Sequence, residues 1–259
     1  MADGSLVFDT KIDSAGFSGG LKRLGVIGLK ATAAVTAGLA AVSGYAVKMS
    51  IDFESAFAGV KKTVEGTDTQ LSNLRQGILD MSKELPASAS EIAGVAEAAG
   101  QLGIQTDNIL DFTRVMIDLG ESTNLTSEQA ATSLARLANI MKTPQTEFSN
   151  LGSTIVALGN NLATTESEIV EMGLRIAGTG SQIGLTESPV LGLAGAMSSV
   201  GINAEAGGSS ISRVMQKINT EVLSAGDNLS SFAALAGRSA EDFANLWKSD
   251  PQAALVAFA

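Results

Sequence analysis

The chain has 259 residues, of which 45% are hydrophobic and 4% aromatic, and its formal net charge is −10. Its length suffices for one large domain or two smaller ones, and its apolar content excludes a disordered chain. It contains no histidine and no cysteine, which excludes disulfides, the usual zinc sites and the Ser–His and Cys–His nucleophile pairs. We therefore expect a structural protein that is not an enzyme, with no cofactor, no metal and no small-molecule substrate.

Residues 1–20 form the first predicted region, an extended segment followed by a turn. The run Leu6-Val7-Phe8 is followed by the alternating residues Thr10 and Ile12, and the glycines at 16, 19 and 20 close it. Alternation that ends in a glycine cluster is typical of a short strand and a turn.

Residues 21–62 predict a long helix that is rich in alanine and glycine. Between Ala31 and Val47 no residue is charged. Small residues recur at every fourth position, which lets two helices approach backbone to backbone, and they are Ala33, Ala37 and Ala41, and Ala40 with Gly44. We expect this face to contact other copies of the chain or its own remainder. Insertion into a lipid bilayer by residues 24–47 is an alternative, because the length is borderline for a membrane span, and a plain linker is another.

Residues 63–259 predict a compact all-α domain, a bundle or stack of about seven to nine short helices. Threonines beside an acid or an amide recur at intervals of nineteen to twenty-one residues, and we expect a new helix to begin at each of them. They are Thr106, Thr126, Thr146, Thr165 and Thr186. Such pairs cap helix N-termini, and Ser88–Glu91, Thr126–Gln129 and Thr165–Glu168 fit the capping box. The repeat concerns helix length and capping, not exact sequence, so it identifies no solenoid family.

Prolines and glycines punctuate the same pattern. Three prolines follow an N-cap candidate, which places them at the first helical position, in the pairs Thr143-Pro144, Ser188-Pro189 and Asp250-Pro251. Four glycines stand where helix C-termini are expected, namely Gly103, Gly120, Gly184 and Gly201.

Charge divides this chain unevenly, and no segment carries a convincing chemical site. Residues 1–62 have a net charge of +2 and residues 63–259 one of −12, so we expect no sequence-specific nucleic-acid binding. Gly178–Gly184 lacks the preceding strand of a nucleotide-binding loop and suggests a flexible loop between helices. Glu166, Glu168 and Glu171 suggest an acidic first helical turn. Gly207-Gly208 suggests a tight entry into the next helix.

Several ordered segments resemble the N-terminal and core region of bacteriophage tail tape measure proteins, also called minor tail proteins. The resemblance begins with residues 8–17 and 20–24 and is strongest at Asp52–Phe57 with Val60–Lys62. It continues through Glu91–Ala93, Ala98–Ile104, Thr164–Glu171 and Ala194–Ile202, and it ends at Trp247–Pro251. None of these is a catalytic signature, and their order along the chain makes the resemblance specific.

This resemblance implies a tape measure role in the virion tail. Proteins of that family fill the lumen of the tail tube, govern tail length and assembly, and leave ahead of the DNA during genome ejection. The implied partners are copies of the chain, tail tube, tail tip or baseplate, and tail chaperone proteins, with the host inner membrane as a further partner if residues 24–47 insert during ejection. Because family members usually run longer, we expect a fragment, the product of a truncated gene or the ordered part of a longer protein, with the ruler beyond Ala259. A helical scaffold or adaptor unrelated to phage is the remaining alternative.

Overall fold

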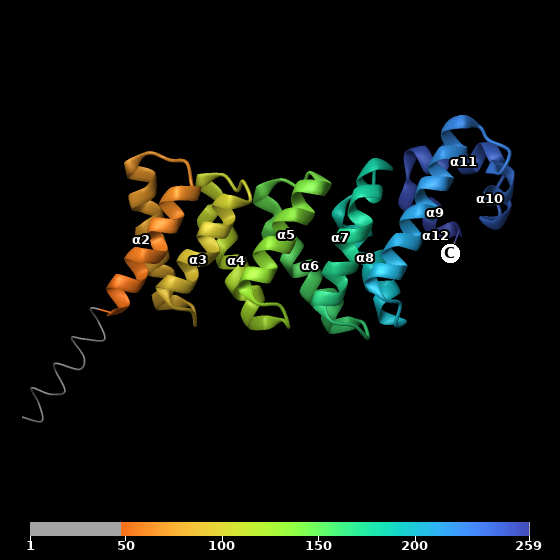
Figure 1. Ribbon diagram of the computed structural model, residues 1–259. Coiled ribbons are helices and arrows are strands. Elements are labelled where there is room, and N and C mark those ends of the chain that lie inside the picture. Colours follow the sequence, from red (N-terminus) through yellow and green to blue (C-terminus); the bar gives the residue numbers. More distant parts are fainter. Residues whose placement is uncertain (1–47, 259) are drawn as a thin grey trace, which may run out of the picture. The chain divides into compact units, whose positions relative to one another are not determined.

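The computed structural model describes residues 48–258, and the chain divides into two compact units, Met1–Asp52 and Phe53–Ala259. A helix covers residues 48–63 at the start of the described part. The predicted extended segment 1–20 and most of the predicted helix 21–62 lie outside the described residues. The two units are described separately, and the following concerns the unit Phe53–Ala259 (Figure 1).

Every regular element of the described residues is a helix, which confirms the all-α prediction. After residue 63 they are α2 (Asp68–Glu84), α3 (Ala89–Gln101), α4 (Ile109–Ser122), α5 (Ser127–Met141), α6 (Phe148–Asn161), α7 (Glu166–Gln182), α8 (Glu187–Ser199), α9 (Ala204–Ser224), α10 (Leu229–Leu235), α11 (Ala240–Ser249) and α12 (Pro251–Phe258). Two short 3-10 helices, η1 (Thr106–Asn108) and η2 (Gln145–Glu147), lead into α4 and α6. The described part holds more helices than the seven to nine expected because its last three helices are short.

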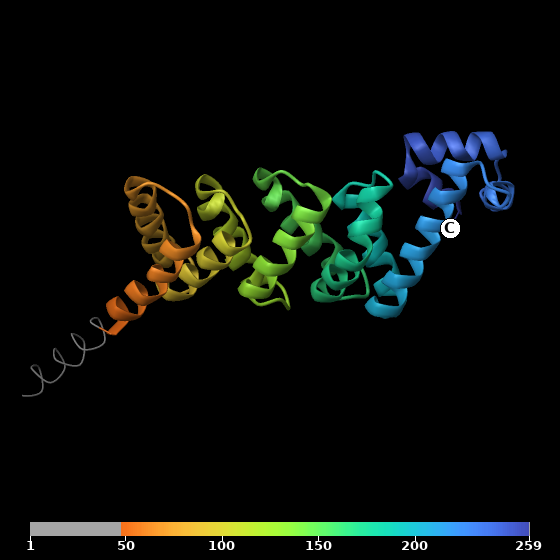
Figure 2. The same cartoon turned by 45° about the horizontal axis from the view of Figure 1, so that its top comes forward.

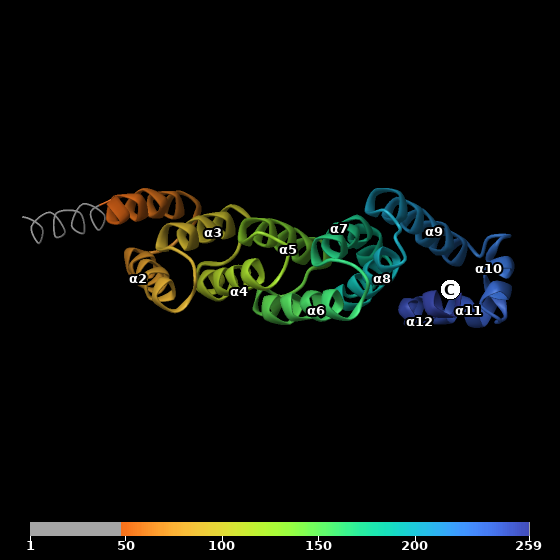
Figure 3. The same cartoon turned by 90° about the horizontal axis from the view of Figure 1, so that it is seen from below.

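The helices α2 to α9 alternate between two layers. Within one layer α3 contacts α5, α5 contacts α7 and α7 contacts α9; within the other, α2, α4, α6 and α8 follow one another in the same way. The two rows are separated in the view of Figure 3, and Figure 2 shows the successive pairs. The helices of the first row begin at residues 89, 127, 166 and 204, at intervals of 38, 39 and 38 residues. The structural repeat is therefore a pair of helices, about twice the helix spacing in the sequence.

Side-chain hydrogen bonds connect corresponding places in successive pairs. Gln145 accepts from the backbone N–H of Gln105 at 2.7 Å and donates to the carbonyl of Gly103 at 3.0 Å. On another loop the amide of Asn124 donates to the Ser167 hydroxyl at 2.8 Å and accepts from the backbone N–H of Ser167 at 3.1 Å. Each of these bonds spans 40 to 43 residues, so it bridges neighbouring repeats.

Capping boxes begin four of these helices, and the three that the sequence predicts are confirmed. The capping residues are Thr67, Ser88, Thr126 and Thr165. Thr186 is the N-cap residue of α8 but makes no side-chain cap bond. The predictions for Thr106 and Thr146 are wrong, since both lie inside the 3-10 helices η1 and η2.

Only one of the three proline predictions is confirmed. Pro251 begins α12, and Asp250 accepts from the backbone N–H of Ala253 at 2.9 Å. Pro144 is itself the N-cap of η2, and Pro189 is the third residue of α8. Both positions tolerate proline for the same reason as the first position of a helix does. The N–H groups of an initial helical turn have no partner within the helix.

The glycines serve two purposes that the sequence pattern does not separate. Gly103, Gly184 and Gly201 have positive φ angles of 81°, 86° and 78° and follow helix ends, as predicted. Gly120, by contrast, lies inside α4 against Ser127. Helix α7 runs through residues 178–182, so the loop predicted there is wrong, and α9 already begins at Ala204, ahead of Gly207 and Gly208.

Gly180 and Gly208 lie inside helices because the absence of a side chain lets neighbouring helices approach closely. A Cβ atom at Gly180 would stand 2.7 Å from Val190 Cγ2, and one at Gly208 would stand 2.6 Å from Arg175 Cβ. Both glycines are buried. Close packing of this kind outweighs the modest helix propensity of glycine, which costs about 1 kcal/mol relative to alanine.

The core of the unit is aliphatic and alanine-rich, with aromatic contacts at a few places. Phe112 and Phe148 join α4 to α6 edge to face, with ring centroids 4.7 Å apart. Phe243 and Trp247 lie four residues apart on α11 with ring centroids 6.1 Å apart, and Trp247 donates to Asn219 of α9 at 3.1 Å. This pair attaches α11 to the end of the stack.

Candidate interaction surfaces

The residues predicted as an oligomer or membrane contact lie outside the described residues. They are Ala33, Ala37, Ala40, Ala41 and Gly44, and their contact remains a prediction. Among the residues that the structure describes, no helix combines the length and apolar character needed to cross a bilayer. The candidate surfaces of the described part are two grooves between helices.

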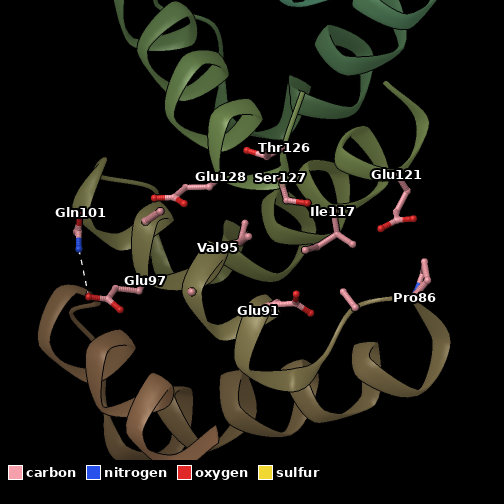
Figure 4. Close-up of a pocket in the computed structure, with 13 residues that line it drawn as sticks. Pro86, Glu91, Val95, Glu97, Gln101, Ile117, Glu121, Thr126, Ser127 and Glu128 are labelled. Atoms are coloured by element: carbon pink, nitrogen blue, oxygen red, sulfur yellow. Dashed lines mark hydrogen bonds between the residues drawn. The ribbon is translucent and has the colours of Figure 1, made fainter. Parts of the chain in front are cut away.

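The first surface, which we name the acidic groove, lies between α3 and the turn that joins α4 to α5 (Figure 4). Its volume is about 660 Å³. Gly94 and Ala98 lie on the α3 side, and a Cβ atom at Gly94 would meet no other atom within 4 Å. The small side chains of α3 therefore leave the space open, and the buried side chains of Val95 and Ile117 contribute an apolar floor.

Four carboxylates line the acidic groove, without a lysine or arginine among the lining residues: Glu91, Glu97, Glu121 and Glu128. Glu97 accepts from Gln101 at 3.2 Å, as the dashed line in Figure 4 marks. Glu91 accepts from the backbone N–H and from the hydroxyl of Ser88, both at 2.8 Å, and these bonds hold its pKa below the usual range. The groove therefore keeps a negative potential at neutral pH.

The chemistry of the acidic groove suits cationic and apolar groups. No group of three or more acidic residues in the described part is arranged to hold a metal ion. Glu91 is committed to capping α3, and Glu128 lies in the first turn of α5. Such a site offers electrostatic attraction and apolar contact.

The second surface, which we name the neutral groove, lies between α6, α8 and α12. Its volume is about 720 Å³, and no charged residue is among its lining residues. The apolar ones are Leu158, Leu185, Pro189, Leu193, Leu255 and Val256. Val256 is 71% exposed, so it adds apolar surface that water can reach at this groove. Helix α6 contains no charged residue at all, so the neutrality extends beyond the groove itself.

The predicted acidic cluster has a structural role in α7. Glu166 and Glu168 lie in the first turn, and Glu168 forms the capping box with Thr165. The backbone N–H of Thr165 and the hydroxyls of Thr164 and Thr165 lower the pKa of Glu168. Glu171 stands 3.8 Å from Arg175 of the same helix. These contacts match the interpretation of an acidic first turn.

Both grooves were missed by the sequence analysis, although a faint signal exists. Each groove lies beside a helix face that carries small residues four apart, Gly94 with Ala98 and Gly192 with Ala196. In a chain this rich in glycine and alanine, the same spacing also occurs at buried contacts such as Gly173 with Ala177. Spacing alone therefore cannot separate an open groove from a closed helix contact.

Comparison with known proteins assigns the described stack to a family. Residues 75–257 match the family model of phage-related minor tail proteins. No curated protein and no solved structure matches the chain. The matched segment runs from within α2 into α12 and covers well over half of the sequence. The chain therefore belongs to the phage-related minor tail protein family.

Proposed function

We propose that the chain is part of a tape measure protein, which fills the tail tube, governs tail length and assembly, and is released during genome ejection. Membership in the minor tail protein family supports the coarser statement that it is a structural component of a phage tail. The finer proposal depends on one observation, namely the order of the segments. The matched stack follows an opening at residues 8–24 and a junction at residues 52–62, both of which resemble tape measure proteins.

The same proposal gives the chain a structural role without catalysis. Within the described residues, the polar side chains at the helix ends are used for capping and for bridging successive helix pairs, as Glu91 and Gln145 illustrate. These bonds fix the stack and leave the carboxylates of Glu91 and Glu168 engaged. We propose that its partners are tail tube, tip or baseplate and chaperone proteins, together with further copies of the chain.

A phage that carries this gene provides the test. Stopping translation within the gene should abolish tails or leave tubes of irregular length, measured by electron microscopy. Peptides from residues 75–257 should be found by mass spectrometry in intact virions and be lost from particles after triggered ejection. Tails of normal length in the nonsense mutant would contradict length control. Retention of the peptides in emptied particles would contradict release, while leaving the tail assignment intact.

A further inference from the structure

We infer that the Phe53–Ala259 unit is built to unravel under tension one helix pair at a time, instead of unfolding in a single event. The inference goes beyond the proposed function and does not depend on it, because it follows from how the helices contact one another. A repeat protein whose units contact only their neighbours divides its stability among local interfaces. The question is whether any contact in this unit ties distant parts together.

Helix contacts in the described part are local throughout the stack. The extensive ones join a helix to the next or to the next but one, and a smaller contact between α5 and α8 reaches further. Helices α10 and α11 contact each other and α9, and α12 contacts α11. Helix α12 also faces α6 and α8 across the neutral groove, so there the chain returns to an earlier part of the stack. Once α12 has left this groove, pulling the two ends apart loads the remaining interfaces in series.

Side-chain bonds between helices have the same short reach. The longest of them, between Asn124 and Ser167, spans 43 residues, and the ion pair of Arg114 with Glu84 spans 30. The chain has no cysteine to form a covalent bridge. The ion pairs between helices are exposed, with 40% to 60% of each side chain accessible to water, and exposed pairs contribute little. Nothing among these bonds resists separation of pairs that are not neighbours.

The interfaces differ in extent, which sets an order of events. The contacts of α7 with α8 and with α9 are the most extensive in the unit. They include Gly180 against Val190 and Gly208 against Arg175, where the missing Cβ atoms let the backbones approach. Helices α10 and α11, by contrast, touch α9 only slightly, chiefly through Trp247. We expect α10–α12 to detach first and the α7–α9 group to separate last.

Single-molecule force spectroscopy on the full chain tests this. Because the chain lacks cysteine, S55C and Q252C, both at exposed positions, provide unique attachment points for handles. We expect a ladder of extensions that each release one helix pair, with a contour length of about 13 nm at roughly 3.5 Å per residue. One event that releases the whole segment between the handles would overturn the inference.

A matched pair of variants tests the order. G180A should lower the force of the final event, whereas G178A, two residues away and with open space around it, should leave that force unchanged or raise it. Equal shifts for both variants would overturn the assignment of the last event to α7–α9. If G180A loses the helical circular dichroism signal, G207A in α9 replaces it. A Cβ there would meet the side-chain ends of Ile202 and of Met172 in α7, and G192A, with open space around it, is its control.

For a protein that leaves a tail tube ahead of DNA, this arrangement means that the highest force needed to unfold the unit is the force that separates one interface. The force experiment uses the isolated chain and the ejection experiment uses virions. A single unfolding event would leave the tape measure proposal standing, and retention in emptied particles would leave the unravelling inference standing.

Discussion

The acidic groove and the neutral groove have nearly the same size but opposite chemistry. Their volumes are about 660 and 720 Å³, yet four carboxylates line the first and no charged residue lines the second. The first lies between helices of the repeating stack, and the second lies between two of its helices and α12. This difference shows that the repeat determines how the helices pack inside, while the charge of the outward side chains differs from one helix pair to another. One fold can therefore offer an electrostatic contact near α3 and an apolar one near α8.

The largest expected effect tests whether the interior of the stack packs as tightly around α3 as around α7. G100A in α3 and G180A in α7 should each destabilise the chain by about 1–3 kcal/mol, because the added methyl overlaps packed atoms. At Gly100 those atoms belong to Thr63, including its backbone, and to Val64, and at Gly180 they belong to Val190. Urea denaturation followed by circular dichroism measures the change. A large loss of stability in only one of the two variants would contradict a shared interior packing.

Matched controls lie on the same two helices. G94A and G178A add a methyl group where no atom lies within 4 Å. Since alanine favours the helix over glycine, each should gain about 0.5–1 kcal/mol. G94A also narrows the acidic groove, so a gain in stability there would show that the groove is not needed for folding. A loss of stability in both controls would show that helical glycines matter for some other reason.

The second largest effect concerns the joint between α3–α4 and α6. Gln145→Ala removes bonds to the backbone of Gln105 and Gly103 and to the side chain of Asn108. Because the site is partly exposed and water can replace the lost partners, we expect a cost of about 1–2 kcal/mol. Q76A, whose amide reaches only Asp80 of the same helix, is the control and should cost much less. An equal cost for both would contradict a bridging role.

A smaller and opposite effect is expected in α4. Thr113 is fully buried, and its hydroxyl has no hydrogen-bond partner. Valine has nearly the same shape without the hydroxyl, so Thr113→Val should stabilise the chain by up to about 1 kcal/mol. The thermal unfolding midpoint should rise. T132V, at a half-buried position, is a comparison that removes a hydroxyl with access to water, and a similar gain there would contradict the explanation.

The smallest effect is a pH dependence of stability, which the first turns of α3 and α7 should show alike. Hydrogen bonds from Ser88 lower the pKa of Glu91, and bonds from Thr165 and Thr164 lower that of Glu168. A carboxyl with a lowered folded-state pKa stabilises the fold above its unfolded pKa of about 4.3, and this contribution is lost as pH falls through the folded value. E91Q and E168Q keep the capping acceptor but do not titrate. Each variant should therefore lose less stability than the parent between neutral and acidic pH.

The fold was predictable from the sequence to the extent that it depends on local chemistry. Capping boxes at Ser88, Thr126 and Thr165 are short-range patterns, so their positions could be read directly. Gly180 and Gly208 were misjudged because their role depends on Val190 and Arg175 of neighbouring helices. The same reason hid the grooves, since an opening is defined by helices that come from separate parts of the chain. Glu128 became a groove residue only when α5 was placed beside α3.

The short reach of the bonds between repeats also bears on how such a chain can change in evolution. Contacts such as Asn124 with Ser167 connect neighbouring pairs alone. Duplication or loss of one segment of 38 or 39 residues, the spacing of the first row, would join two interfaces of the kind already present. Genes for this unit can therefore lengthen or shorten by whole helix pairs without redesign of a central core. Changes of other lengths would break the alternation of the two rows, so that the interfaces of neighbouring pairs would no longer match.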